Sequence, residues 1–268
     1  MTGLPPSLFT VLGATGYIGS RLAAHLRAQG HTVWTPTRGD AGVFTRPLGH
    51  VMYCVGLTAD FRTRPFDTVD AHVGLLAEVL RRAQFDSLLY LSSTRVYMGA
   101  TRTDEDAPLT VLPGDPSYLY NLTKLTGESL CHASGRAGVR VARLSNVVGP
   151  GMDAASGNLV ADLLHQAQQG HIVLRSDPQS AKDYLHVDDL LDWLPRIALE
   201  GRAAAYNVAS GEQTTHREWL DWLASTHAAT VVVAERAPWQ SFAPIDVTRL
   251  RNEFGWKPRR ILVDGEAW

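Results

Sequence analysis

The chain has 268 residues, a formal net charge of −2 and 45% hydrophobic residues, and it contains two cysteines, Cys54 and Cys131. Such a composition is typical of a globular protein with one large α/β domain or two smaller ones. The charge gives no indication of a nucleic-acid or anionic-membrane partner, and isolated cysteines exclude a disulfide framework or a zinc site. The first nine residues lack a secretory signal, and no apolar run approaches the ~20 residues of a membrane span, so we expect a soluble, cytoplasmic protein.

Short apolar runs alternate with helical patterns over the first 150 residues. We expect buried strands at 8–12, 32–35, 51–55, 88–92 and 139–144, and helices at 17–29, 67–83 and 118–133. This alternation predicts an α/β fold with a doubly wound, mostly parallel sheet of the Rossmann type.

The alternation becomes less regular after residue 150. We expect helices at 158–169, 187–199 and 217–227, and strands at 171–174, 205–208 and 231–234. The predicted domains are a dinucleotide-binding domain at 1–150 and a small C-terminal α+β substrate lobe at 151–268, with the chain crossing back near 183–208.

A glycine-rich turn, Gly13-Ala-Thr-Gly16-Tyr-Ile-Gly19, joins the first expected strand to the first expected helix. Glycines at such a turn let backbone amides approach a pyrophosphate at the positive end of the helix, although an ordinary tight turn can carry the same residues. The predicted cofactor contacts in this loop are Gly13, Thr15, Gly16, Tyr17, Ile18 and Gly19.

The end of the second expected strand bears on the choice of dinucleotide. An acidic residue about 20 positions past the loop would bind the ribose 2′-hydroxyl of NAD, whereas an Arg suits the 2′-phosphate of NADP. Thr37 stands in the acidic position and Arg38 follows it, so we predict both as cofactor-binding residues and favour NADP(H). NAD(H) stays possible, with Asp40 binding the ribose.

Tyr120 and Lys124 are four residues apart in an expected helix, so their side chains share one face. A nearby ammonium lowers the pKa of a phenol from its usual value of about 10. Such a phenol exchanges a proton with a carbonyl or alcohol oxygen near neutral pH. Taken alone, however, this spacing is common on helix surfaces.

Three motifs in this order, the glycine loop, Ser92-Ser-Thr-Arg-Val-Tyr97 and Tyr120-x-x-x-Lys124, resemble the extended short-chain dehydrogenase/reductases. The resemblance is to the NAD-dependent epimerase/dehydratase family that acts on nucleotide sugars. Segments similar to the substrate lobe of that family occur at 143–151, 183–190, 206–212 and 254–258, so the similarity spans nearly the whole chain.

The resemblance implies roles for the matching residues. Tyr120 would donate or accept the proton, Lys124 would lower its pKa and hold the nicotinamide ribose, and Ser93 would orient the reacting sugar oxygen. The substrate contacts that we predict are Ser93, Thr94, Asn146 and Arg236. The cluster around His186 would support the junction between the lobes, and we expect no metal ion there.

Two departures from the family pattern restrict the function. The family's 4,6-dehydratases carry Asp-Glu directly after the catalytic hydroxyl, where this chain has Thr94-Arg95, so we expect no dehydration. Only about a dozen residues separate Arg38 from the apolar run that begins at Val51. The family usually fits another helix and strand there, so we expect a loosely held, exposed adenine.

Two activities use the same catalytic set. We favour NADPH-dependent reduction of a 4-keto(-6-deoxy) sugar nucleotide in sugar or polysaccharide biosynthesis, with Tyr120 as general acid; the alternative is a nucleotide-sugar 4-epimerase with tightly bound NAD. A catalytically idle binding protein is disfavoured, because Ser93, Tyr120 and Lys124 are all present. The resemblance also implies a possible homodimer through the helices expected at 67–83 and 118–133.

Overall fold

The computed structural model describes residues 5–58, 60–240 and 242–262. The chain forms two compact units. The first comprises Met1–Val96, Val111–Leu144 and Asp188–Val208, and the second comprises Tyr97–Thr110, Ser145–Val187 and Ala209–Trp268.

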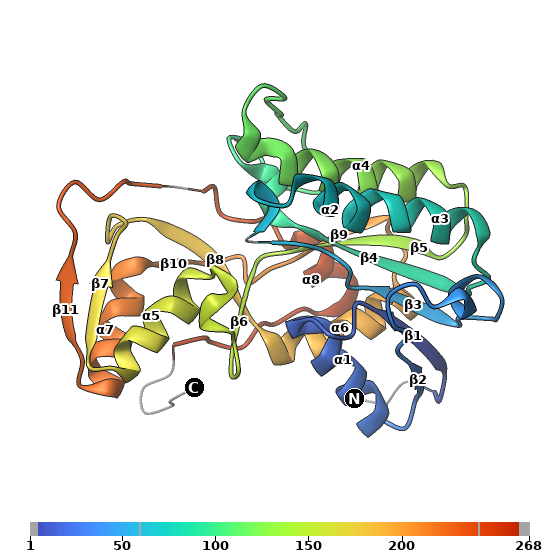
Figure 1. Ribbon diagram of the computed structural model, residues 1–268, viewed down its shortest axis with the longest axis horizontal. Coiled ribbons are helices and arrows are strands. Elements are labelled where there is room, and N and C mark those ends of the chain that lie inside the picture. The colour runs from blue at the N-terminus through green and yellow to red at the C-terminus, as the bar shows by residue number, and fades with distance from the viewer. Residues whose placement is uncertain (1–4, 59, 241, 263–268) are drawn as a thin grey trace. The chain divides into compact units, whose positions relative to one another are not determined.

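A six-stranded parallel sheet forms the centre of the first unit, with the strand order β2-β1-β3-β4-β5-β9 (Figure 1). The strands are β1 (Leu8–Leu12), β2 (Thr32–Trp34), β3 (His50–Tyr53), β4 (Ser87–Ser93), β5 (Val139–Leu144) and β9 (Ala205–Val208). The apolar runs of β1, β3 and β4 are buried almost throughout, as expected for parallel strands covered on both faces. The predicted doubly wound parallel sheet is confirmed.

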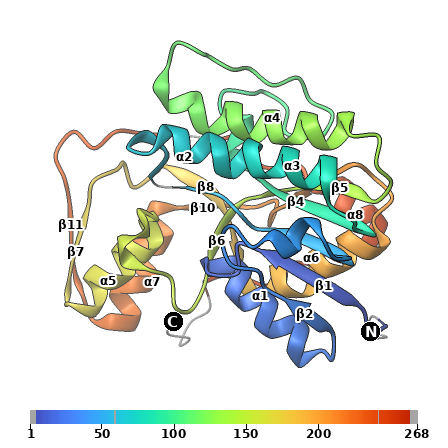
Figure 2. The same cartoon turned by 45° about the vertical axis from the view of Figure 1, so that its right-hand side comes forward.

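Helices cover both faces of this sheet (Figures 1 and 2). On one face lie α1 (Tyr17–Ala28) and α6 (Val187–Glu200), and on the other lie α2 (Pro65–Val69), α3 (Leu75–Arg82) and α4 (Leu119–Ala133). The apolar face of α3 packs on the sheet, where Leu76 and Val79 join Tyr53 and Tyr90 in a buried cluster. None of the helices in the described parts of the chain is both long enough and apolar enough to cross a bilayer.

The connection between β2 and β3 is short. It contains a single 3₁₀ turn, η1 (Ala41–Phe44), whose first free amide, that of Gly42, donates to the Asp40 carboxylate at 2.8 Å. Strand β2 is therefore an edge of the sheet, next to β1.

The regular helix predicted at 67–83 is wrong in its middle. The structure has α2, then a π turn, η3 (Asp70–Gly74), and then α3. A π turn inserts one residue into the helical repeat, and such turns are frequent at functional sites. Here the turn contains His72, which is fully buried.

The described residues of the second unit form two small sheets, β10-β8-β6 and β11-β7. Its elements are β6 (Asn146–Val148), α5 (Leu159–Gln168), β7 (His171–Leu174), β8 (Ala181–His186), β10 (Gln213–Thr215), α7 (His216–His227), β11 (Thr230–Val233) and α8 (Thr248–Phe254). Its core lies around Trp219, Leu220 and Leu223 of α7. Sequence periodicity did not reveal β6, β8, β10 and α8, because three of these are very short and β8 carries Lys182 and Asp183.

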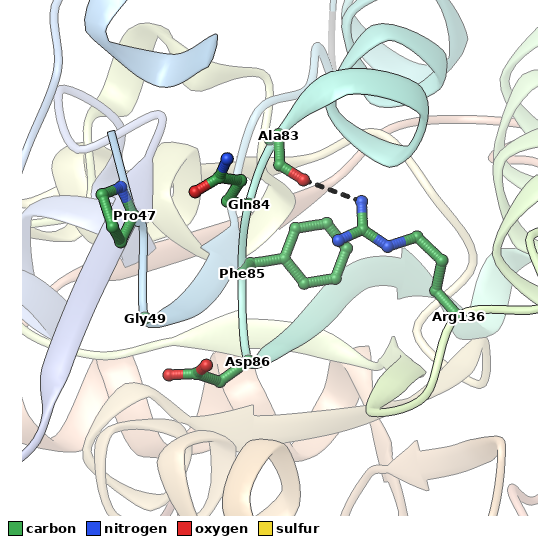
Figure 3. Close-up of a pocket in the computed structure, with 7 residues that line it drawn as sticks. All are labelled: Pro47, Gly49, Ala83, Gln84, Phe85, Asp86 and Arg136. Carbon is green, nitrogen blue, oxygen red and sulfur yellow. Dashed lines mark hydrogen bonds between the residues drawn. The ribbon is translucent and has the colours of Figure 1, made fainter. Parts of the chain in front are cut away.

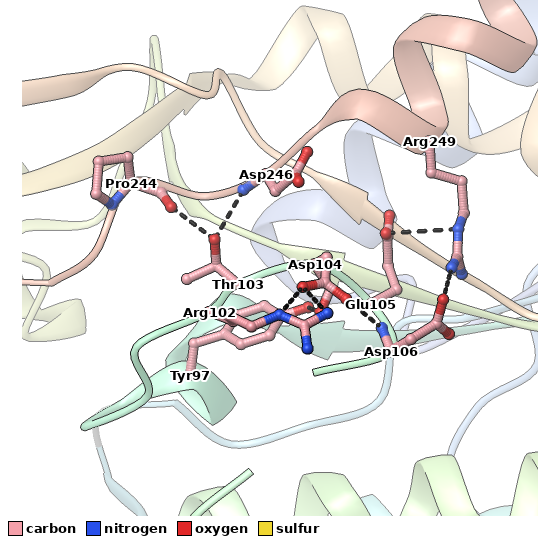
Figure 4. A network of polar contacts seen from close by, with 9 residues as sticks. All are labelled: Tyr97, Arg102, Thr103, Asp104, Glu105, Asp106, Pro244, Asp246 and Arg249. Atoms are coloured by element: carbon pink, nitrogen blue, oxygen red, sulfur yellow. Dashed lines mark hydrogen bonds and ion pairs between the residues drawn. The ribbon is translucent and has the colours of Figure 1, made fainter. Parts of the chain in front are cut away.

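Within the second unit, a polar network joins the segment after Tyr97 to the start of α8 (Figure 4). The Thr103 hydroxyl donates to the Pro244 carbonyl at 2.6 Å and accepts from the Asp246 amide at 3.0 Å. Arg249 pairs with Glu105 at 3.5 Å and also with the neighbouring Asp106. These contacts fix two segments that are about 140 residues apart in the sequence.

Candidate active site

The glycine turn lies at the carboxyl end of β1, between β1 and α1. Gly13 has a φ of +83°, and a Cβ there would come within 2.8 Å of the Cys54 carbonyl group. A Cβ on Gly19 would overlap the Gly13 carbonyl oxygen. The packing of the chain therefore requires glycine at both positions.

Gly16 differs from the other two glycines. A Cβ there would meet the Gly13 oxygen at 3.5 Å, an ordinary contact, and the backbone is extended at φ −82°. Chain packing gives no reason for this glycine, whereas close approach of a pyrophosphate does. The first turn of α1 contains no acidic residue, so its positive end can hold an anion.

The position of this turn in the sheet is consistent with nucleotide binding. Strands β2 and β3 lie on opposite sides of β1, so the strand order reverses there, and ligands of open α/β sheets bind at such a point. Thr15, Tyr17 and Ile18 lie in the turn and at the start of α1. The residues present therefore fit a dinucleotide.

The residues after β2 that could bind the cofactor ribose differ in whether the protein already binds their side chains. Thr37 and Arg38 are exposed just past the end of the strand. Asp40, the alternative ribose ligand, has one carboxylate oxygen engaged as the cap of η1.

Tyr120 and Lys124 lie one turn apart on α4, and Ser93 is the last residue of β4. Both α4 side chains are buried. Burial raises the pKa of Tyr120, while a hydrogen bond with the Ser93 side chain and the charge of Arg95 lower it. These three residues, which the sequence identified, come together in the first unit, and their catalytic roles stay predictions.

Lys124 lies beside the phenol, and its role there stays a prediction. Its Nζ lies 5.9 Å from the centre of the Tyr120 ring. Burial lowers the pKa of Lys124 itself to about 7. Its Nζ donates to the Leu91 carbonyl at 2.8 Å.

A buried ion pair lies behind Lys124, and the sequence reasoning missed it. Glu128, one turn further along α4, accepts from Arg143 Nε at 3.1 Å and from Nη2 at 2.7 Å, and it also accepts a short bond from the Ser92 hydroxyl. The Glu128 carboxylate opposes the effect of burial and raises the pKa of Lys124. The spacing of four residues between Lys124 and Glu128 was a usable signal that these two side chains are neighbours on α4.

His72 was also missed. Its Nε2 accepts from the Leu57 amide at 3.3 Å, which leaves the ring proton on Nδ1, 2.8 Å from the Thr123 hydroxyl. Its ring meets that of Tyr120 edge-on at 5.3 Å. Burial and then the charge of Lys124 lower the pKa of His72 to about 3, so it is neutral and cannot act as a cation beside the phenol. No sequence pattern indicated this residue, because it depends on the π turn.

The predicted substrate contacts lie in both units. Thr94 is buried next to Ser93 in the first unit. In the second unit, Asn146 donates to the Asp183 carbonyl at 2.8 Å, and Arg236 is exposed with a φ of +54°. The roles of all four in binding a substrate stay predictions.

An open pocket of about 360 Å³ lies elsewhere in the first unit (Figure 3). Arg136 stacks on Phe85 there, 3.6 Å from the ring centre, and donates to the Ala83 carbonyl at 2.9 Å. Gly49 and Asp86 line the pocket immediately before β3 and β4 begin. The pocket is thus at the amino ends of the strands, opposite to the carboxyl ends where such sheets bind ligands.

The thiols contribute no nucleophile. Burial raises the pKa of Cys54 and of Cys131 to about 12, so both stay protonated at neutral pH. Within the described ranges, no group of three or more His, Cys, Asp or Glu side chains could hold a metal ion.

Residues 9–209 match the NAD dependent epimerase/dehydratase family. The chain belongs to this family. The family expected from its motifs is thereby confirmed, and the chain is an enzyme of an NAD(P)-dependent group. The match includes the glycine turn, Ser93, Tyr120 and Lys124.

Relatives with different reactions cover nearly the whole chain. GDP-6-deoxy-D-mannose reductase from Pseudomonas aeruginosa is 28% identical over 96% of this chain and 96% of its own length. The dTDP-6-deoxy-L-talose 4-dehydrogenase (NAD(P)(+)) of Kitasatospora kifunensis is 28% identical over 98% and 95%. UDP-glucose 4-epimerase from Mycolicibacterium smegmatis is 26% identical over 96% and 95%.

Solved structures agree on the fold. The structure of RMD from Pseudomonas aeruginosa complexed with NADPH has a TM-score of 0.78 at 24% identity, and it covers 97% of this chain and 95% of that one. UDP-glucuronic acid 4-epimerase from Bacillus cereus, in complex with UDP-glucuronic acid and NAD, has a TM-score of 0.77 at 18% identity, with 96% of each chain covered.

Proposed function

We propose that the chain is an NADPH-dependent reductase of a 4-keto or 4-keto-6-deoxy sugar nucleotide. The observation that carries this proposal is the buried Tyr120 phenol, hydrogen-bonded to Ser93, with its pKa raised. A phenol that holds its proton is ready to act as a general acid, which is the role that reduction of a carbonyl requires.

The reaction divides into a hydride step and a proton step. The bound nicotinamide would supply a hydride to the carbonyl carbon. Tyr120 gives its proton to the carbonyl oxygen and becomes a phenolate, while the Ser93 hydroxyl orients the same oxygen. The nearby amine of Lys124 takes up a proton readily at neutral pH, since its pKa is about 7, and it can then stabilise the phenolate.

Several features support NADPH as the cofactor. Arg38 is exposed beyond β2, and its guanidinium suits a 2′-phosphate. Asp40 is engaged as a helix cap, which makes it a poorer ribose ligand. A relative of the same fold is known complexed with NADPH.

Epimerisation at C4 is the second candidate function. The same Ser93, Tyr120 and Lys124 set serves both reactions, and a UDP-glucose 4-epimerase is among the relatives that cover nearly the whole chain. Dehydration has less support although dTDP-glucose 4,6-dehydratases are also relatives, because Thr94 and Arg95 cannot replace the two carboxylates it needs.

A panel of dTDP-, UDP-, GDP- and CDP-linked 4-keto and 4-hydroxy sugars, with NADPH or NADH and monitored at the nicotinamide absorbance, tests the proposal. We expect oxidation of NADPH by at least one 4-keto sugar nucleotide. Stoichiometric NAD released when the purified protein is denatured, together with interconversion of 4-hydroxy sugars, would favour the epimerase instead.

We also propose a homodimer through the helices α2, α3 and α4, which correspond to the segments 67–83 and 118–133. Phe66 and Val69 on α2 are 84% and 39% exposed, so this face presents apolar side chains to solvent. Light scattering on the wild type and on Phe66→Asp tests it. A dimer that the substitution does not weaken would place the interface elsewhere.

A further inference from the structure

Arg95 lies in the 3₁₀ turn η4 (Thr94–Tyr97), which directly follows β4. Its side chain is half-buried, and two acceptors of the α4 region hold it. Nε donates to Asn121 Oδ1 at 3.1 Å, and Nη2 donates to the Ser117 carbonyl at 3.3 Å. Asn121 returns a bond to the Arg95 carbonyl at 3.1 Å. The guanidinium is therefore fixed relative to α4.

The position of this guanidinium relates it to the catalytic set. Its Cζ lies 6.0 Å from the centre of the Tyr120 ring and 5.6 Å from that of Phe61. The Arg95 amide donates to Ser93 Oγ at 3.2 Å. Arg95 thus contacts the Ser93 hydroxyl, which is hydrogen-bonded to the phenol. It also binds the side chain of Asn121, the residue after Tyr120.

The other ionisable groups around the phenol provide less permanent positive charge. The pKa of Lys124 is lowered to about 7, so its charge changes near neutral pH, and His72 is neutral because its pKa is lowered to about 3. Burial raises the pKa of Tyr90, which stays neutral, and Arg62 stacks 4.4 Å from the centre of the Phe61 ring. Burial lowers the pKa of Arg95 from the very high value of a free guanidinium, but the group stays charged at neutral pH.

We propose that Arg95 is a positioning residue that acts through Tyr120, its guanidinium supplying the fixed positive charge beside the catalytic phenol. The proposal rests on the proposed role of Tyr120 as the acid. A fixed cation favours the phenolate that proton donation leaves behind, and thereby offsets part of the effect of burial. The direction agrees with the lowering effect of Arg95 on the pKa of Tyr120.

Nuclear magnetic resonance of the full chain with ¹³Cζ-labelled tyrosine tests this directly, with Tyr120 assigned from the signal that Tyr120→Phe lacks. We expect the phenol to titrate at higher pH in Arg95→Gln than in the wild type, and close to the wild type in Arg95→Lys, which keeps the charge. Arg46→Gln, which removes an arginine stacked on Trp34 at the edge strand, is the control and should cause no shift. Circular dichroism at each pH shows that the chain is still folded.

An unchanged titration in Arg95→Gln, or an equal shift in Arg95→Gln and Arg95→Lys, would overturn the proposal, since a purely structural role does not depend on charge. If Arg95→Gln does not fold, Arg95→Met keeps the aliphatic stem and should show the same upward shift. The titration needs no substrate. An upward shift without turnover of any keto sugar would support the role of Arg95 and overturn the proposed reaction instead.

Discussion

Glu128 lies one helical turn beyond Lys124, and its carboxylate raises the pKa of that buried amine against the larger effect of burial. Arg143 holds the same carboxylate through two of its nitrogens, and all three residues are at least nine-tenths buried. The charge state of the lysine therefore depends on an ion pair that itself belongs to the interior of the fold.

Replacement of Glu128 by Gln should destabilise the protein strongly, because the Arg143 charge would be left buried without a partner. We expect the free energy of unfolding to fall by about 3–5 kcal/mol, measured by urea denaturation. Glu78→Gln is the matched control, since Glu78 pairs with Arg81 and Arg82 at the surface and its loss should cost less than ~1 kcal/mol. A loss for Glu128→Gln as small as that of the control would contradict the expectation.

Lys124→Met should change how stability depends on pH. The pKa of this amine is about 7 in the folded chain and ~10.4 when unfolded, so between these values the unfolded chain binds the extra proton. The wild type therefore gains stability as pH rises through this window, a gain that Met removes. We expect the stability of Lys124→Met relative to wild type to be greater at pH 7 than at pH 10. Urea denaturation at both pH values measures the free energy of unfolding of the two proteins. A difference between them that does not depend on pH would show that burial does not lower the pKa of Lys124.

Gly13→Ala and Gly16→Ala should fail in different ways. The positive φ and the crowding at Gly13 predict a loss of at least ~1 kcal/mol of folding stability, seen in thermal unfolding. Gly16→Ala should fold normally and weaken NADPH binding by ~10-fold or more, as followed by nicotinamide fluorescence, because its methyl group would stand where the pyrophosphate approaches. Unaltered NADPH binding by Gly16→Ala would remove that glycine from the cofactor site.

Tyr120→Phe should lower turnover by about 10²–10⁴-fold, the usual contribution of a positioned acid, while NADPH still binds. Tyr118→Phe, at a phenol that is also buried but has no lysine one turn on, should keep most of the activity. If Tyr118→Phe were the inactive variant, the assignment of the acid would be reversed.

Arg38→Ala should raise the dissociation constant of NADPH by ~10-fold or more and leave that of NADH unchanged, because only NADPH carries the 2′-phosphate. Arg46→Ala, which removes an arginine stacked on Trp34 of β2, controls for the loss of any positive charge near this strand. Equal effects on the two cofactors would mean that Arg38 does not read the phosphate.

Much of the first unit was predictable, because apolar strands and amphipathic helices alternate there in a regular pattern. Apolar runs gave β1 and β5 to the residue, and the glycine turn together with Ser93, Tyr120 and Lys124 indicated the family. The π turn around His72 was not predictable, since one inserted residue leaves the apolar pattern of the segment nearly unchanged. The four-residue spacing identified Lys124 as the neighbour of Tyr120. It could not show how deeply the phenol is buried, and this burial raises the pKa of Tyr120.

The short connection between β2 and β3 has a consequence for solubility. It leaves β2 as an edge strand, and unpaired edges can recruit strands from other molecules. This edge is three residues long, Arg27 donates to its Val33 carbonyl at 3.4 Å, and Arg46 stacks 4.4 Å from the centre of the Trp34 ring. The short length of this edge strand and the two charged side chains beside it disfavour pairing with a strand of another molecule.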